Sequence, residues 1–164
     1  MMKKLKTYKQ LFENSRMDAI IKRFRDVLIE AVQHDNIKLA KEIIEEGIDI
    51  NFKLNDSYII SIAAKKGFNN MFDLLFEYNP TKESISETFY SLAFQQYLFG
   101  GYKKFSEMIF HILGKTTDFN FIKGNETNYF PFYFNDEDME KFKKKYPDKY
   151  TEYVKINKVK DFNL

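Results

Sequence analysis

The amino-acid sequence predicts an all-α protein built from stacked helical repeats. An apolar run that begins at Leu28 returns at Ile60, thirty-two residues later. In each copy a second apolar run follows, through Ile43-Ile44 in the first copy and Leu75-Phe76 in the second. A period in the low thirties is typical of helical repeats that bury their cores against neighbours and leave one long face for a partner.

Three motifs lie within this repeated apolar pattern. They are Glu42-Ile-Ile-Glu-Glu-Gly47, Gly47-Ile-Asp-Ile-Asn51 and Ala63-Ala-Lys-Lys-Gly67. In that order they resemble the end of the second helix, the hairpin, and the first helix with its turn in the ankyrin repeat. The resemblance covers residues 25–80. The family's TPLH tetrapeptide is missing, since Tyr58-Ile-Ile-Ser61 stands in its place, so the repeats are expected to be less regular than consensus ones.

A degenerate third copy occupies residues 81–121. Four more residues separate Ala93 from Gly101 than separate Ala63 from Gly67, which predicts a first helix about one turn longer. The second helix of repeat two is expected to end at Asn79-Pro80. Repeat three is expected to run over 84–99, turn at 100–101 and return over 103–113.

The N-terminal segment is expected to cap the stack. Leu5, Tyr8, Leu11 and Phe12 lie at helical spacing, and Ser15 is predicted to begin a new helix that carries the first repeat to Gln33. A terminal repeat exposes the face meant for a neighbour. Residues 1–24 are therefore expected to cover repeat one.

The C-terminal appendage, residues 122–164, does not follow the repeat. Tyr129–Phe134 is an aromatic run interrupted by proline, and a helix is predicted to start at Asp136, end before Pro147 and be followed by a second short helix with Tyr150. Two interpretations stay open. The aromatic residues cover the open end of repeat three, or the appendage is itself a partner-binding element.

Composition predicts one domain over residues 1–164. The chain is 44% hydrophobic, has a net charge of +2 and contains no cysteine, which excludes disulfides and thiolate chemistry. No general attraction to nucleic acid or an anionic membrane is expected. The N-terminus lacks the apolar core of a signal peptide, so a cytoplasmic location is expected. The abundance of Lys, Asn, Ile, Phe and Tyr suggests a low-GC bacterial or phage source.

No catalytic or metal-binding constellation is evident, and no cofactor is expected. His34 and His111 have no helical zinc partner, and His111 is expected to be a partly exposed structural residue. Asp136–Asp138 is read as helix capping. The acidic run offsets Lys143–Lys145, so nucleic-acid binding is not expected.

The predicted function is binding of another protein, as a small inhibitor, immunity factor or host-directed effector. The alternatives are a structural subunit, or an enzyme or nucleotide-binding protein with its site in the appendage. The resemblance implies a partner surface on the hairpin tips and first helices. Its candidate residues are Arg25, Gln33, His34, Phe52, Leu54, Asn55, Ser57, Lys65 and Lys66. Phe52 and Leu54 are the strongest candidates for contact with a partner, because exposed apolar groups mark contact sites. The alternative is that they fold back against Tyr58 or a neighbouring hairpin.

Overall fold

The computed structural model of the chain describes residues 2–98, 103–116 and 136–161, and these are mostly helical. The predicted all-α class is confirmed. In chain order the elements are α1 (Met2–Gln33), α2 (Ile37–Glu45), β1 (Lys53–Leu54), β2 (Ser57–Tyr58), α3 (Ile59–Lys66), α4 (Asn69–Glu77), α5 (Lys82–Leu98), α6 (Lys103–Lys115), α7 (Asp136–Lys145) and α8 (Pro147–Asp161).

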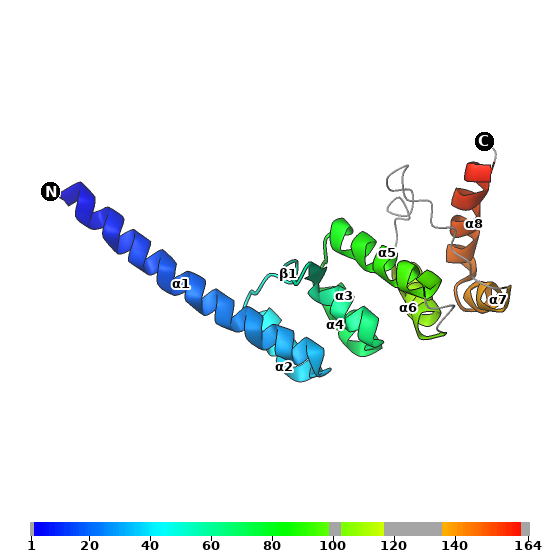
Figure 1. Ribbon diagram of the computed structural model, residues 1–164, viewed down its shortest axis with the longest axis horizontal. Coiled ribbons are helices and arrows are strands. Elements are labelled where there is room, and N and C mark those ends of the chain that lie inside the picture. The colour runs from blue at the N-terminus through cyan, green and yellow to red at the C-terminus, as the bar shows by residue number, and fades with distance from the viewer. Residues whose placement is uncertain (1, 99–102, 117–135, 162–164) are drawn as a thin grey trace.

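The helices pack as consecutive pairs. Helix α1 contacts α2, α3 contacts α4, and α5 contacts α6, while α1, α3 and α5 also pack against one another in that order. Figure 1 shows the three pairs side by side, with the small β1–β2 hairpin at one edge and α7 and α8 beyond α6. The first helices of the pairs and the hairpin therefore form one continuous side of the molecule.

The predicted packing positions are largely confirmed. Ala31 and Ala63 are 1% and 0% exposed, and Ile43, Ile44 and Leu75 are also buried. Phe76 is the exception, because it is only half-buried, and its ring lies tilted against Phe72 with the centroids 5.8 Å apart. At the position equivalent to Ile44, the larger Phe side chain does not fit wholly inside the core.

The turns of the first two pairs share their backbone geometry at the same thirty-two-residue offset. Asp35 and Gly67, which follow the first helices, have φ of 55° and 73°. Gly47 and Asn79, which follow the second helices, have φ of 88° and 55°. Glycine, asparagine and aspartate tolerate this left-handed region best. Helix α4 ends at Glu77, just before Asn79-Pro80 as predicted.

The predicted helix boundary at Ser15 is wrong. Helix α1 runs without a break from Met2 to Gln33, and it projects from the packed pairs as a single rod (Figure 1). No glycine or proline interrupts the chain there, and the neighbouring Glu13, Arg16 and Met17 are good helix formers. Residues 16–23 are all exposed, so this part of the expected N-terminal cap covers nothing.

The third pair departs from the first two. Helix α5 has 17 residues against 8 in α3, which exceeds the one extra turn predicted. Helix α6 passes through Gly114 to Lys115, so the predicted end at Leu113 is wrong. The expected turn at 100–101, the hairpin echo at 118–120 and the aromatic run at 129–134 lie outside the described residues.

The described part of the appendage covers the end of the third pair. Phe142 of α7 is 1% exposed, and its ring stacks on Phe110 of α6 with the centroids 5.1 Å apart and the planes at 10°. Tyr146 and Tyr150 approach the same ring at 5.9 and 6.2 Å. The boundary before Pro147 is as predicted, because α7 ends at Lys145 and α8 begins at the proline.

Candidate protein-binding surface

A short β-hairpin connects α2 with α3. Lys53 pairs with Tyr58 and Leu54 with Ser57 in antiparallel register, which leaves Asn55 and Asp56 as a two-residue loop. These two residues have φ of 47° and 62°. Positive φ at both loop positions defines the type I′ turn, whose twist matches that of paired strands. The tip is thus fixed by its own local geometry.

Contacts with α5 anchor the hairpin from the other side. The Lys53 ammonium donates to Glu87 at 2.7 Å and lies 4.6 Å from the centre of the Tyr58 ring. The hydrogen bond with Glu87 raises the pKa of Lys53. Burial raises the pKa of Tyr58, and a hydrogen bond with Glu83 raises it further. The hairpin and the first turns of α5 therefore behave as one unit.

The chain leading into the hairpin is also held. The Asp49 carboxylate accepts a hydrogen bond from the Asn51 backbone N–H at 2.9 Å, and the Asn51 side-chain oxygen accepts one from the Thr81 N–H at 2.8 Å. Asn51 thereby joins the first inter-pair loop to the start of α5, thirty residues further along.

Arg25 and Phe52 form a stacked pair. The guanidinium carbon of Arg25 lies 5.0 Å from the centre of the Phe52 ring, a cation–π distance. Phe52 is half-buried and packs against the core, so the fold-back alternative applies to it. The Arg25 Nε is buried and has no hydrogen-bond partner among the described residues.

The other predicted residues near the tip also lie close together. The Lys65 ammonium, on α3, donates to the Ser57 hydroxyl at 3.3 Å, and Ser57 faces Leu54 across the hairpin. Leu54 is half-buried and Asn55 is exposed. We call the six residues at this end the hairpin group: Arg25, Phe52, Leu54, Asn55, Ser57 and Lys65.

The remaining three predicted residues lie at or just beyond the C-terminal ends of α1 and α3. The Lys66 ammonium donates to the Gln33 carbonyl oxygen at 3.0 Å, which ties the two helix ends together. His34 is exposed, and its Nδ1 lies 3.0 Å from the Glu30 carbonyl oxygen. We call Gln33, His34 and Lys66 the helix-end group. Lys66 directly follows Lys65 at the end of α3, but its side chain bonds to the end of α1, whereas that of Lys65 bonds to Ser57 of the hairpin.

Four residues that hold the hairpin in place were not predicted from the sequence. They are Lys53, Tyr58, Glu83 and Glu87. Reading Asn55-Asp56 as a two-residue hairpin loop would have placed Lys53 opposite Tyr58, because the loop length fixes the register. The two glutamates lie one turn apart on α5, and no local pattern connects them with the hairpin.

His111 is half-buried, as predicted, in a charged contact between α4 and α6. Its Nε2 lies 2.6 Å from an Asp73 carboxylate oxygen, which also forms an ion pair with the Lys115 ammonium at 2.9 Å. The imidazole meets the Phe72 ring edge-on. Next to it is a cavity of about 260 Å³, lined by Asn69, Glu107, Phe110, His111, Asp138, Lys141, Phe142 and Lys145. These groups hold α4, α6 and α7 together.

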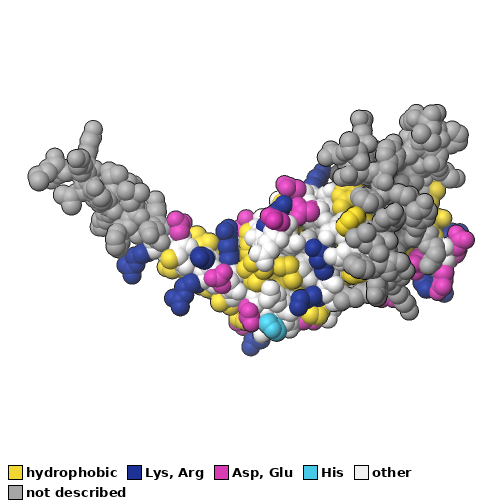
Figure 2. All heavy atoms as spheres, viewed as in Figure 1, with side chains coloured by type: hydrophobic (Ala, Val, Ile, Leu, Met, Phe, Trp, Pro, Cys, Tyr) yellow, Lys and Arg dark blue, Asp and Glu magenta, His cyan; other side chains and the backbone are white. Residues whose placement is uncertain are grey.

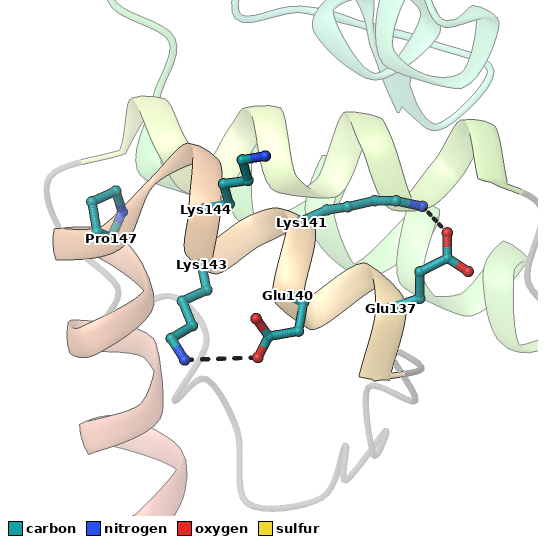
Figure 3. Close-up of a pocket in the computed structure, with 6 residues that line it drawn as sticks. All are labelled: Glu137, Glu140, Lys141, Lys143, Lys144 and Pro147. Carbon is teal, nitrogen blue, oxygen red and sulfur yellow. Dashed lines mark hydrogen bonds and ion pairs between the residues drawn. The ribbon is translucent and has the colours of Figure 1, made fainter.

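A shallow depression on α7 is lined by charged side chains (Figure 3). Lys141 bonds to Glu137 at 2.5 Å, and Lys143 lies 3.7 Å from Glu140. The bond with Glu137 raises the pKa of Lys141. The figure shows these two lysines directed toward their own glutamates, along the helix, and not toward a common centre.

Among the described residues, no group of three His, Cys, Asp or Glu side chains is placed to hold a metal ion. No helix in the described ranges is both long and apolar enough to cross a membrane. Comparison of the chain with protein families, curated proteins and solved structures returns no match.

Proposed function

We propose that the protein is an ankyrin-like repeat protein that binds another protein through the hairpin group and the neighbouring first helices. The motifs at residues 42–51 and 63–67 support the repeat assignment, as do the turn angles that recur thirty-two residues apart. The three helix pairs correspond to the three repeats, with α7 and α8 as the C-terminal cover.

The observation that carries this proposal is the set of contacts and turn angles that hold the hairpin. Its turn is fixed by two residues of positive φ, Lys53 attaches it to Glu87, and Asn51 attaches its base to Thr81. A preformed surface loses little conformational entropy on docking, so affinity can arise without any chemistry. The stacked Arg25–Phe52 pair offers the two residue types, arginine and an aromatic, that are typical of interface anchors.

The mode of action that follows is occlusion of a partner in the cytoplasm. Such a role suits an inhibitor, immunity factor or effector, each of which acts by covering a surface of its partner. Carboxylate groups are the complement we expect on the partner, because Arg25 and Lys65 supply cationic donors within the hairpin group.

The test begins with capture of partners by the tagged full chain from a lysate of its source cells, identified by mass spectrometry. Binding of a captured protein is then measured by calorimetry. Phe52→Ala and Leu54→Ala should each weaken binding by roughly 1–3 kcal/mol if they are central, and Lys65→Glu and Lys66→Glu by less, with a dependence on salt.

Lys38→Glu is the matched charge-reversal control. Lys38 is on the second helix α2, and its side chain is 89% exposed, so the change should affect neither folding nor binding. Circular dichroism checks that each variant is folded. If all four changes leave the affinity equal to that of the control, this side of the molecule is not the binding surface and the proposal fails.

A further inference from the structure

The projecting part of α1 carries a row of exposed apolar side chains. Met17 is 58% exposed, Ile20 48% and Val27 39%, and Phe24 between them is half-buried. Their spacings are three, four and three residues, which is the a/d pattern of a coiled-coil seam. We call these four residues the α1 seam. Figure 2 shows apolar, basic and acidic side chains together on the described part of this rod.

The α1 seam is continuous with the protein's own core. The next position in the same pattern is Ala31, which is 1% exposed where α1 packs into the first helix pair. One face of one helix is therefore covered at its C-terminal end and uncovered further back. Helices draw most of their stability in water from packing of such a face, so an uncovered seam calls for a partner.

A second helix on the α1 seam would lie to one side of the face that α1 packs onto the rest of the protein. Leu28 is buried in the core, and Met17, Phe24, Ile20 and Val27 point roughly 20°, 40°, 80° and 100° around the helix from it, all in the same sense. Phe24 already packs against the core, so the area left for a partner lies along Ile20 and Val27 and over residues 16–23, which are all exposed.

We propose that this partner is a second copy of the chain, with the two α1 helices antiparallel. When Met17 lies opposite Val27 of the second copy, Ile20 lies opposite Phe24, so each seam residue meets an apolar one. The two-fold axis passes near residue 22, and Ile21, itself 37% exposed, meets its own copy close to that axis. The seam is thus complementary to itself.

The flanking charges favour the antiparallel direction. Arg16 and Glu30 both occupy the g position of the heptad pattern and are both exposed. Antiparallel helices bring g positions together, so each Arg16 faces Glu30 of the other copy, twice per dimer. Arg23 faces its own copy in this arrangement, a like-charge contact that water and salt screen at these exposed positions. Parallel helices would instead place Arg16 beside Ile21, without a charge partner.

Sedimentation equilibrium of the full chain provides the first test. With rising concentration the mass should move from 19.7 kDa toward twice that value. Ile20→Glu should weaken dimerisation by about tenfold or more, because it places a charge in the seam. Phe94→Glu on α5 is the control, since Phe94 is similarly exposed at 43% but lies far along the chain from α1. Circular dichroism confirms folding of both variants.

A charge exchange tests the pairing. Arg16→Glu and Glu30→Arg should each weaken the dimer, because each creates two like-charge contacts. The double variant Arg16→Glu/Glu30→Arg should regain most of the lost affinity, since the pairs are restored with their signs reversed. If the double variant loses as much dimerisation free energy as the two single variants lose in sum, the pairing is overturned.

Engineered cysteines test the direction of the helices, because the chain has none of its own. Met17→Cys and Val27→Cys should form a mixed disulfide when the two variants are combined under oxidising conditions, and neither should cross-link efficiently alone. Self-cross-linking of each variant would show parallel helices and overturn the proposal. A chain that stays monomeric at every concentration, or a dimer unaffected by Ile20→Glu, would also overturn it.

Discussion

The ring of Tyr146 lies directly against Gly114, so that a β-carbon on Gly114 would be 2.4 Å from the tyrosine Cε1 and 2.5 Å from Cζ. Tyr146 stands where α7 gives way to α8, and Gly114 is in the last turn of α6. The glycine is therefore required for close contact between two parts of the chain. It does not end the helix, although a glycine at a helix end suggests that role.

Replacing Gly114 with alanine should destabilise the attachment of α7 and α8. Alanine raises helix propensity by about 1 kcal/mol, but separations under 3 Å force the tyrosine ring away, at a cost of about 1–3 kcal/mol. We expect a net loss in the free energy of unfolding, measured by urea titration with circular dichroism.

The control is the same change in a Tyr146→Ala background. There the ring is gone and only the propensity term remains, so Gly114→Ala should become neutral or stabilising. An equal loss in both backgrounds would show that the tyrosine is not the cause.

A buried pair of hydroxyls joins α3 and α5 and makes a second prediction. The Thr88 hydroxyl donates to the Ser84 carbonyl oxygen at 2.6 Å, which leaves the Ser61 hydroxyl to donate to Thr88 at 2.5 Å. Thr88→Val should cost about 1–3 kcal/mol, because it leaves the buried Ser61 hydroxyl without an acceptor. Ser61→Ala removes only a donor and should cost less.

The double variant Ser61→Ala/Thr88→Val supplies the internal control. With both hydroxyls absent, no buried polar group lacks a partner. The double variant should therefore lose less free energy of unfolding than the two single variants lose in sum. Strict additivity, measured by urea unfolding, would contradict a hydrogen bond between these residues.

The sequence could predict the elements whose signal is local. Ala31 and Ala63 are buried at equivalent places because small residues recur where helices approach closely, and Pro80 marks the end of α4. Contacts between distant segments left no such signal. Phe142 covers Phe110, which is thirty-two residues earlier in the chain, and it belongs to a helix whose sequence is highly charged. The covering role was therefore predicted for the aromatic run at 129–134 instead.

In the candidate surface, too, the local contacts could be predicted from the sequence and the contacts between distant segments could not. The hairpin and its approximate position follow from the motif at residues 47–51, and Lys65 and Ser57 lie together there. The contact of Arg25 with Phe52 joins the middle of a long helix to a loop, and the Lys53–Glu87 pair spans thirty-four residues. The helix boundary expected at Ser15 failed because a capping residue acts only where the chain turns, and nothing there makes it turn.

A third prediction concerns packing between the helix pairs. Ala63 is 0% exposed on α3, between α1 and α5, so Ala63→Leu should destabilise the protein by about 1–3 kcal/mol through overpacking. Ala19→Leu is the matched control, because Ala19 is exposed on α1 and both residues have high helix propensity. Thermal unfolding at low protein concentration compares the two. Equal melting temperatures would mean that α3 does not pack as tightly as the structure shows.

The last prediction is a loss of stability at alkaline pH that originates at the hairpin. The pKa of Tyr58 lies above its ordinary 10.0, mainly through burial, and that of Lys53 lies above its ordinary 10.5, mainly through its bond with Glu87. Both groups therefore hold their protons more tightly in the folded than in the unfolded chain. Their contribution to stability is complete below the unfolded pKa values and is lost as the pH rises through the higher folded ones.

We therefore expect the free energy of unfolding, from urea titrations, to fall as the pH rises above about 10. Tyr58→Phe should reduce that fall, because the phenylalanine has no proton to lose, and Glu87→Gln should reduce the part due to Lys53. Lys38→Glu, which changes a side chain 89% exposed on α2, should leave the shape of the profile unchanged. If the wild type and Tyr58→Phe lose stability equally, the titration lies elsewhere, and the hairpin is not the element of the fold that high pH loosens first.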